Sequence, residues 1–511
     1  MKLDYTRLLL FAALCVCIRS ALADEPSIED GWLLTRDPAT TYHTMTRELT
    51  LHPKSEPKPA LKHRLLPDEF DLLDGNAAIY YLKAMGFLEQ RMANEKLNDI
   101  HKQGVAEAKS KETTLDQVPP FSYQETPPNK LPIKQVKEYL ALTNFQTHYL
   151  EEARKLRAFS LDRNLNHVDN PVGYLLPEVQ SMRELARIQR VRCRLAIAEG
   201  RIDDAIKILG QQYAMAKHLG TDEFYVSALV GIAISGIGWT DALYLIEHDQ
   251  TPNLYWAFAS LPAPLVDLKR SHAFEGQFLF EQIKVLREVD ETRRTVDYWQ
   301  TFTDRFMKQA TGLESDGINF GLTGDPKMDR VRMAAFIAAA FPGAARYLQE
   351  SEEIPSEMVE AYPTAQVVFL AMKRYYERMR DDYFKWNHFP ISQSIHAAKR
   401  EESEHRKNKD RIGLAGVLPD TLLPALGGMR GANARVQQNI AMIQAVEAIR
   451  MYSASHDGKL PLVLSDAPVP VPNDPLTDQP FGYESNGTTG VLSGSAASHI
   501  RYRLILKTAP K

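Results

Sequence analysis

Apolar side chains recur every three or four residues through most of the chain, which is the spacing of one face of an α-helix. Clear stripes of this kind lie within residues 278–306 and 368–383. Residues 194–217 predict one helix that ends at Gly200 and a second helix that turns Ala205 and Leu209 inward. The pattern therefore predicts a mainly α protein built from consecutive helices.

Small residues at the crossing of these two predicted helices resemble the tetratricopeptide pattern, and residues 231–247 hold a second, partial copy. A solenoid of such repeats normally needs at least three stacked copies to be stable. We therefore predict an irregular tetratricopeptide-like helical array over residues 71–430, interrupted by a Pro-rich linker at 119–132.

The two ends of the chain differ from this helical centre. Residues 24–70 contain scattered prolines and few periodic apolar positions, which predicts an extended N-terminal arm. Residues 431–511 predict a small α+β module in which an amphipathic helix stops at Gly458 and an antiparallel hairpin or sheet follows. Asn486-Gly487 is a hairpin-turn signal within it. Truncation at Asp466 is expected to uncover the helix and to leave the central helices folded.

Residues 1–23 have the pattern of a secretory signal peptide. Lys2 and Arg7 precede an apolar run, and Ala21-Leu22-Ala23 matches an A-x-A site, which places cleavage between Ala23 and Asp24. The apolar run is shorter than the ~20 residues that span a bilayer. We expect a protein that is secreted or periplasmic, in the cell envelope.

Residues 224–246 form a second apolar segment, long enough to be tested as a transmembrane span. Asp241 would then lie inside the hydrocarbon, and the small residues around it allow close helix packing. We interpret the segment as buried core helices and expect no stable membrane span after signal removal.

Charge and cysteine usage narrow the choice of partners. The formal net charge of −4 and the pI of about 6.4 give no basic field, so no nucleic-acid partner is expected. Two of the three cysteines lie in the signal peptide, and the remaining Cys193 cannot form an internal disulfide. Unknown protein or glycan partners remain open.

Six stretches carry a family resemblance: PALKHRLLPDEFDLLDGNAA (59–78), RLAIAEGRIDDAIKIL (194–209), LVGIAISG (229–236), PNLYWAFASLPAPLVDLKR (252–270), VEAIRMYSASHDGKLPLVL (446–464) and DPLTDQPFGYE (474–484). Together they resemble a family of exported, mostly helical proteins common in planctomycete genomes. Residues 252–270 are the most specific part of the match. The family has no assigned biochemical function, so the resemblance implies export and a helical fold but no activity.

The C-terminal module has a separate similarity. Tyr452, Gly458 and Pro461, followed by Asp474-Pro475, stand in a helix-loop-sheet order over residues 436–484. This order is similar to the C-terminal half of type II secretion pseudopilins. A pseudopilin begins with a membrane-inserted helix, whereas this module ends a long chain. The similarity therefore implies a pseudopilin-like fold for the module rather than assembly into a pilus.

Few residues offer recognisable chemistry. His396 and His405 bracket three glutamates, but HEXXH is absent and we interpret the run as a solvated, charged helix face. No G-x-S-x-G, Walker or G-x-G-x-x-G motif occurs. We therefore predict no catalytic residue and no cofactor.

Residues 473–478 are the one metal candidate. Asp474 and Asp478 lie close in sequence to further oxygen donors, and some pseudopilins hold Ca²⁺ in a comparable place. The alternative is an Asp-Pro turn with Asp478 facing water, because Ca²⁺ wants six or more oxygen ligands. Trp256 likewise offers two interpretations, a platform for a sugar or an anchor between helices.

Three functions fit these observations. The first is a non-catalytic helical scaffold or binding protein of the cell envelope, because stacked helices present an extended surface. The second is a glycan or cell-wall hydrolase whose two carboxylates are distant in sequence. The third is an accessory component of the envelope secretion machinery, which the C-terminal module favours. A deep cleft with two carboxylates about 5 to 9.5 Å apart would favour the hydrolase.

Overall fold

The computed structural model describes residues 27–36, 43–86, 91–164, 176–314, 322–417, 420, 425–495 and 500–507. The predicted signal peptide and its cleavage site, Ala23 and Asp24, lie outside the described residues. The fold is mainly α with a small sheet, which confirms the predicted fold class.

The chain divides into two compact units. The helical unit is built mainly from Lys269–Gly431, and the sheet unit from Ile18–Leu161, Leu176–Leu268 and Ala432–Lys511. The predicted array over 71–430 is thus not one body, because its first half belongs with the sheet. The predicted start of the C-terminal module, at 431, falls beside a boundary between the units.

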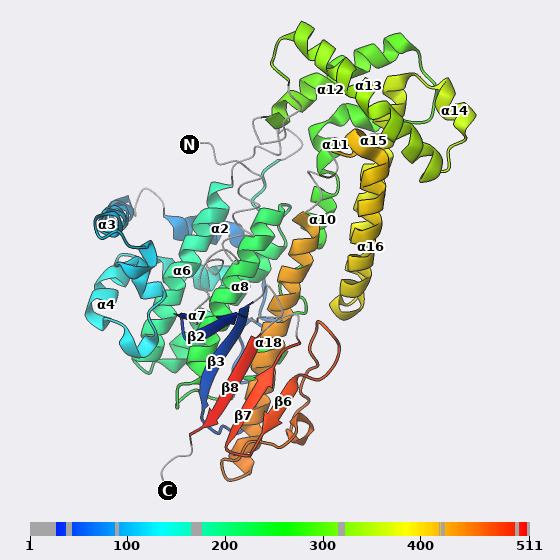
Figure 1. Ribbon diagram of the computed structural model, residues 1–511. Coiled ribbons are helices and arrows are strands. Elements are labelled where there is room, and N and C mark those ends of the chain that lie inside the picture. The colour runs from blue at the N-terminus through cyan, green and yellow to red at the C-terminus, as the bar shows by residue number, and fades with distance from the viewer. Residues whose placement is uncertain are drawn as a thin grey trace. The chain divides into compact units, whose positions relative to one another are not determined.

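The sheet of the sheet unit joins the two ends of the described chain (Figure 1). Its six strands follow the order β1-β2-β3-β8-β7-β6. Their bounds are β1 (Ser27–Glu29), β2 (Trp32–Arg36), β3 (His43–Leu51), β6 (Gly482–Ser485), β7 (Thr489–Ser493) and β8 (Ile500–Leu506). All neighbours are antiparallel except β3 and β8, which run parallel from the Met45–Ile500 pair to the Leu51–Leu506 pair.

The N-terminal residues predicted as an extended arm therefore contain half of a sheet. Leu49 and Leu51 are fully buried, and they alternate with threonines, the pattern of a half-buried strand. The alternation is hard to recognise in the sequence because Arg47 interrupts it at an inward position. Arg47 is nevertheless buried, since its guanidinium binds the carboxylate of Glu247 at 2.9 Å.

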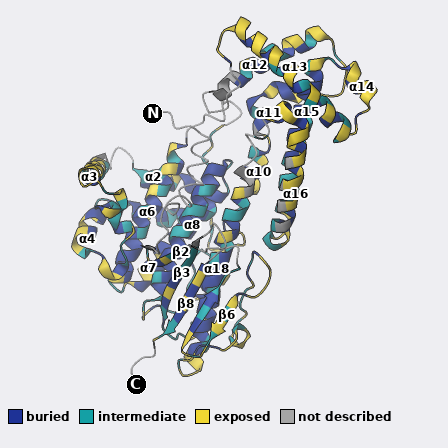
Figure 2. Ribbon diagram, in the orientation of Figure 1, coloured by how far each residue is buried: buried dark blue, intermediate teal, exposed yellow. Residues whose placement is uncertain are grey.

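The sheet unit also contains helices. They are α2 (Ala77–Met85), α3 (Arg91–Ser110), α4 (Ile133–Ala141), α5 (Asn144–Arg154), α6 (Pro177–Ala198), α7 (Ile202–Gly220), α8 (Tyr225–Ile246), α9 (Tyr255–Ala259) and most of α18 (Ala425–Ser455). Figure 2 shows the buried residues gathered in α6, α7 and α8, whereas α3 and α4 are largely exposed. The predicted break between two helices is confirmed, because α6 ends before Gly200, whose φ of 69° is the left-handed conformation.

The Pro-rich linker at 119–132 is part of the core of the sheet unit. It forms short 3-10 turns, η3 (Phe121–Gln124) and η4 (Pro128–Lys130). Tyr123 and Leu131 pack in one buried cluster with Val191 and Leu195 of α6. The segment thus connects helices in the sequence but fills space beside α6 in the fold.

The helical unit consists of packed helices without a strand among its described residues. They are α10 (Lys269–Glu275), α11 (Phe278–Gln282), α12 (Val296–Glu314), α13 (Pro326–Glu350), α14 (Ser356–Ala361), α15 (Thr364–Phe384) and α16 (Ile391–Ile412). The apolar stripes within 278–306 and 368–383 pack against each other in the core of this unit. The rings of Phe302 and Phe306 each lie 4.9 Å from that of Phe369. The indole of Trp299 donates a hydrogen bond to Gln366 at 3.1 Å.

Helix α8 is the apolar segment that could be mistaken for a membrane span. Its most apolar window has a mean hydropathy of 1.6, and 67% of that window is buried inside the structure. Asp241 is fully buried, with its carboxylate 3.3 Å from the guanidinium of Arg194 and 2.9 Å from the amide of Gln212. Both partners lie on neighbouring helices, which favours the interpretation as a core helix.

We therefore predict that the mature chain leaves membranes completely on carbonate extraction, because α8 already has protein partners on its polar and apolar sides. The measurement is the distribution of the chain between supernatant and pellet. A chain that resists extraction and floats with lipid would show that α8 spans the bilayer.

A network of charges fastens the β1–β2 turn to the helices. Asp30 at this turn binds Arg194 at 2.8 Å and also Arg190, both on α6. The hydroxyl of Tyr244 on α8 donates to Asp30 at 3.0 Å. Asp241 lies on the other side of the Arg194 guanidinium, so that one buried arginine is shared by two carboxylates. The acids and bases are thereby neutralised within the core.

His218 on α7 is buried and links α2 to β5 (Leu156–Ala158) through hydrogen bonds. Its Nε2 lies 3.0 Å from the carbonyl of Leu156 and must donate to it. Its Nδ1 therefore accepts from the hydroxyl of Tyr81 at 2.8 Å. Burial lowers the pKa of His218 to about 4, from its ordinary value of 6.5.

This neutral histidine makes the sheet unit sensitive to acid. In the unfolded chain His218 takes up a proton at its ordinary pKa. The stability that the neutral His218 contributes is therefore complete above pH 6.5 and is lost as the pH falls toward 4. The expected loss is about 3 kcal/mol across that window. The amide of His218→Gln can keep both hydrogen bonds without titrating. We predict that the free energy of unfolding of this variant, measured by urea titration, falls less steeply with decreasing pH than that of the wild type. His456→Gln, at an exposed position, is the control, and equal acid sensitivity of both variants would refute the prediction.

Candidate functional site

The Pro-rich loop at 461–480 is the candidate site, because its residues line a cavity. The loop follows α18, and its side chains point alternately to two sides. Ala467, Val469 and Val471 pack onto a buried cluster formed by Tyr255, Ala448 and Met451. The prolines between them point the other way, and Pro468 and Pro470 are exposed. The alternation holds the backbone extended and presents a row of proline rings.

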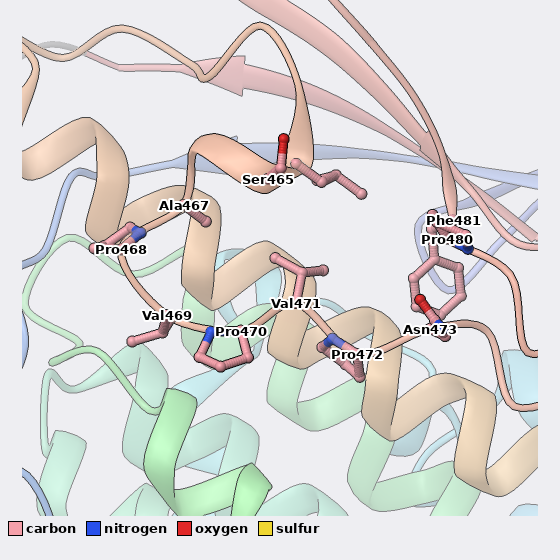
Figure 3. Close-up of a pocket in the computed structure, with 11 residues that line it drawn as sticks. Ser465, Ala467, Pro468, Val469, Pro470, Val471, Pro472, Asn473, Pro480 and Phe481 are labelled. Carbon is pink, nitrogen blue, oxygen red and sulfur yellow. The ribbon is translucent and has the colours of Figure 1, made fainter.

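The cavity has a volume of about 390 Å³, and Figure 3 shows its lining side chains along the loop beside α18. The lining residues are Leu464, Ser465, Ala467, Pro468, Val469, Pro470, Val471, Pro472, Asn473, Pro480 and Phe481. None of them is titratable, and only Ser465 and Asn473 carry a polar side chain. The cavity can therefore accept apolar groups, but its lining supplies neither a general acid nor a general base.

One end of the loop is fixed by Asp474. Its buried carboxylate accepts hydrogen bonds from the amide of Gln438 at 2.7 Å and from the backbone N–H groups of Ser495 and Leu476 at 2.7 and 2.9 Å. Asp478 is exposed and adopts a left-handed φ of 57°, with its N–H bonded to the Asp474 carbonyl. The geometry is that of the Asp-Pro turn. A Ca²⁺ ion at Asp474 would have to displace three N–H donors that already fill most of its lone pairs.

Helix α18 also carries a buried ion pair, next in sequence to Ala448 and Met451 of the cluster under the loop. Glu447 and Arg450 are both fully buried and lie 2.7 Å apart. Arg450 also donates to the carbonyls of Thr251 and His52, at 2.9 and 3.0 Å. Glu447 accepts from the backbone N–H of Leu254 at 3.1 Å. Because burial is its largest influence, the pKa of Glu447 is raised above its ordinary value.

Trp256 lies two residues after Leu254, whose backbone N–H binds Glu447. Its indole N–H donates to Glu56 at 2.6 Å, and its ring meets the Tyr255 ring edge-on at 5.0 Å. The side chain is half-buried and packs with the loop cluster. These contacts favour the interpretation as an anchor, since one edge and one face of the indole already have protein partners.

Three acids of the sheet unit are paired with arginines; Asp241 and Glu447 are fully buried and Glu247 is half-buried. Asp241, Glu247 and Glu447 each bind an arginine, at 3.3, 2.9 and 2.7 Å. Burial raises the pKa of each of these three carboxyls above its ordinary value, and the neighbouring arginine acts in the opposite direction. These three acids do not line the cavity at the loop, whose lining contains no carboxylate of the kind that a glycoside hydrolase requires.

Comparison with family models, with curated proteins and with solved structures gives no significant match. The resemblance to exported planctomycete proteins and the similarity to pseudopilins therefore stay predictions from the sequence.

Proposed function

We propose that the protein is an exported, non-catalytic binding protein of the cell envelope, and that the Pro-rich loop at 461–480 is its docking surface. The observation that supports this most directly is the cavity lining, which contains no titratable side chain. Acid–base and nucleophilic catalysis both need such a group beside the bound substrate. Binding through apolar contact does not.

The lining also favours a protein partner over a glycan. A sugar carries hydroxyl groups that each need a hydrogen-bond partner when they are buried. Ser465 and Asn473 provide few such partners, whereas valine, leucine and proline side chains provide apolar surface. We infer that the occupant is an extended segment of a partner protein with apolar side chains.

Export rests on the sequence pattern of residues 1–23. Cleavage between Ala23 and Asp24 would leave strand β1 intact, because it begins at Ser27. We predict that Edman sequencing of the protein from its host begins at Asp24. A mature chain that keeps Met1 and fractionates with the cytoplasm would contradict export.

The docking proposal is tested by co-sedimentation of the mature chain with an envelope fraction of its host. Ser465→Trp places a large ring at the mouth of the cavity and should abolish most of the binding. Ser455→Trp adds the same ring at an exposed position of α18 outside the cavity lining and should bind like the wild type.

Two treatments separate the alternatives. Protease digestion of the envelope fraction should remove the binding partner, whereas a glycan partner would survive it. Mass spectrometry of the supernatant should find no newly released glycan fragments. Release of such fragments by the wild type would show that the protein is a hydrolase and would overturn the proposal.

A further inference from the structure

Helices α15 and α16 bring together three side chains with metal-ligating atoms. Asp382 lies in the last turn of α15, and Glu401 and His405 are four residues apart on α16, so both face the same side of that helix. One ligand atom from each of the three lies within 4.8 Å of the other two. All three belong to the helical unit, whereas the loop described above belongs to the sheet unit.

His405 is the unusual member of this group. Its side chain is 95% buried, since only 5% of the residue is exposed, yet neither ring nitrogen has a hydrogen-bond partner. Its ring stacks on Tyr383, with 5.0 Å between the ring centres. A buried imidazole without a partner costs free energy of folding, and such groups call for an explanation in an ion or ligand. The sequence-based interpretation of this run as a solvated face is therefore wrong at His405.

A cation already lies between the two carboxylates. The ammonium of Lys385 is 2.7 Å from Asp382 and 2.8 Å from Glu401. Lys385 sits on η7 (Lys385–His388), and 45% of its side chain is exposed, so it can swing into solvent. The carboxylates are thus arranged around a positive charge that can leave, beside an imidazole that lacks a partner.

From this geometry we propose that Asp382, Glu401 and His405 form a binding site for a divalent transition-metal ion, and that Lys385 occupies the site when the metal is absent. Two carboxylate oxygens and one imidazole nitrogen suit Zn²⁺, whereas Mg²⁺ and Ca²⁺ prefer oxygen ligands alone. Three protein ligands leave a coordination position open to water.

The test is calorimetric titration of the tag-free mature chain with Zn²⁺, with each ligand variant paired to a neighbour. Asp382→Asn, Glu401→Gln and His405→Phe should each weaken Zn²⁺ binding by about tenfold or more. The matched controls Asp381→Asn, Glu404→Gln and His388→Ala change exposed neighbours and should bind like the wild type. Lys385→Met removes the competing ammonium and should tighten binding by about tenfold.

His405→Phe also separates a metal ligand from a core residue. The phenyl ring keeps the stacking on Tyr383 and removes two unsatisfied nitrogens, so in EDTA the variant should melt at or above the wild-type temperature. Zn²⁺ should raise the melting temperature of the wild type and leave that of the variant unchanged. Equal Zn²⁺ affinity of wild type and His405→Phe, or no gain on Lys385→Met, would overturn the proposal.

Discussion

Replacing Arg450 by methionine is expected to lower the free energy of unfolding by about 3–5 kcal/mol. The substitution keeps most of the side-chain volume but removes every bond of the guanidinium. Glu447 would then remain fully buried with one backbone N–H as its donor, from Leu254. The carbonyls of Thr251 and His52 would lose their donor as well. Removal of one partner of a buried pair is costly because the other charge stays in the core.

A double-mutant cycle distinguishes this explanation from simple loss of packing. Combining Arg450→Met with Glu447→Gln removes both charges, and the double variant should be more stable than the sum of the single losses predicts. Burial raises the pKa of Glu447, so the loss in Arg450→Met should shrink as the pH falls and the carboxylate takes up a proton. Urea unfolding measures both effects. Arg501→Met, at an exposed position of β8, is the control, and strict additivity in the cycle would contradict the buried-charge argument.

Truncation at Asp466 is expected to unfold the sheet unit, including helices that the sequence predicted to survive. The cut removes β6, β7 and β8, and β8 is an inner strand of the sheet. Strand β3 would lose its parallel partner, and the fully buried Leu49 and Leu51 would lose the residues paired with them on β8. The hydroxyl of Tyr502, which accepts a hydrogen bond at 2.8 Å from the indole of Trp239 on α8, would be lost with β8.

Hydrogen exchange measured segment by segment resolves this outcome. In the truncated chain, amides of α7 and α8 should lose protection, whereas those of α15 in the helical unit should keep it. Truncation after Lys507 removes only residues 508–511 and should change neither. Tyr502→Phe should cost about 1 kcal/mol, the value of one hydrogen bond, rather than the whole unit. Protection of α8 in the Asp466 truncation would show that the helices fold without the sheet.

The sequence alone determined the local elements, because their causes are local. Periodic apolar positions produced the helices of both units, and Gly200 and Gly458 end α6 and α18 with φ values of 69° and 71°. The Asn486-Gly487 turn joins β6 and β7 as predicted, with Gly487 at a φ of 89°. The Pro-rich loop and the α+β character of the C-terminal module were likewise visible without the fold.

The tertiary structure alone decided which distant segments meet. Strands β3 and β8 pair in parallel and are far apart in the sequence, so no hairpin turn indicates the pairing. Arg47 interrupts the apolar alternation of β3, and only the fold shows that Glu247 binds its charge. In the sequence, Asp474 could be a metal ligand, but in the fold its carboxylate accepts three hydrogen bonds. His405 lies in a charged run that predicts a solvated face, but in the fold it is buried and makes no hydrogen bond. Charge and burial at these positions depend on neighbours contributed by other elements, so no local pattern could predict them.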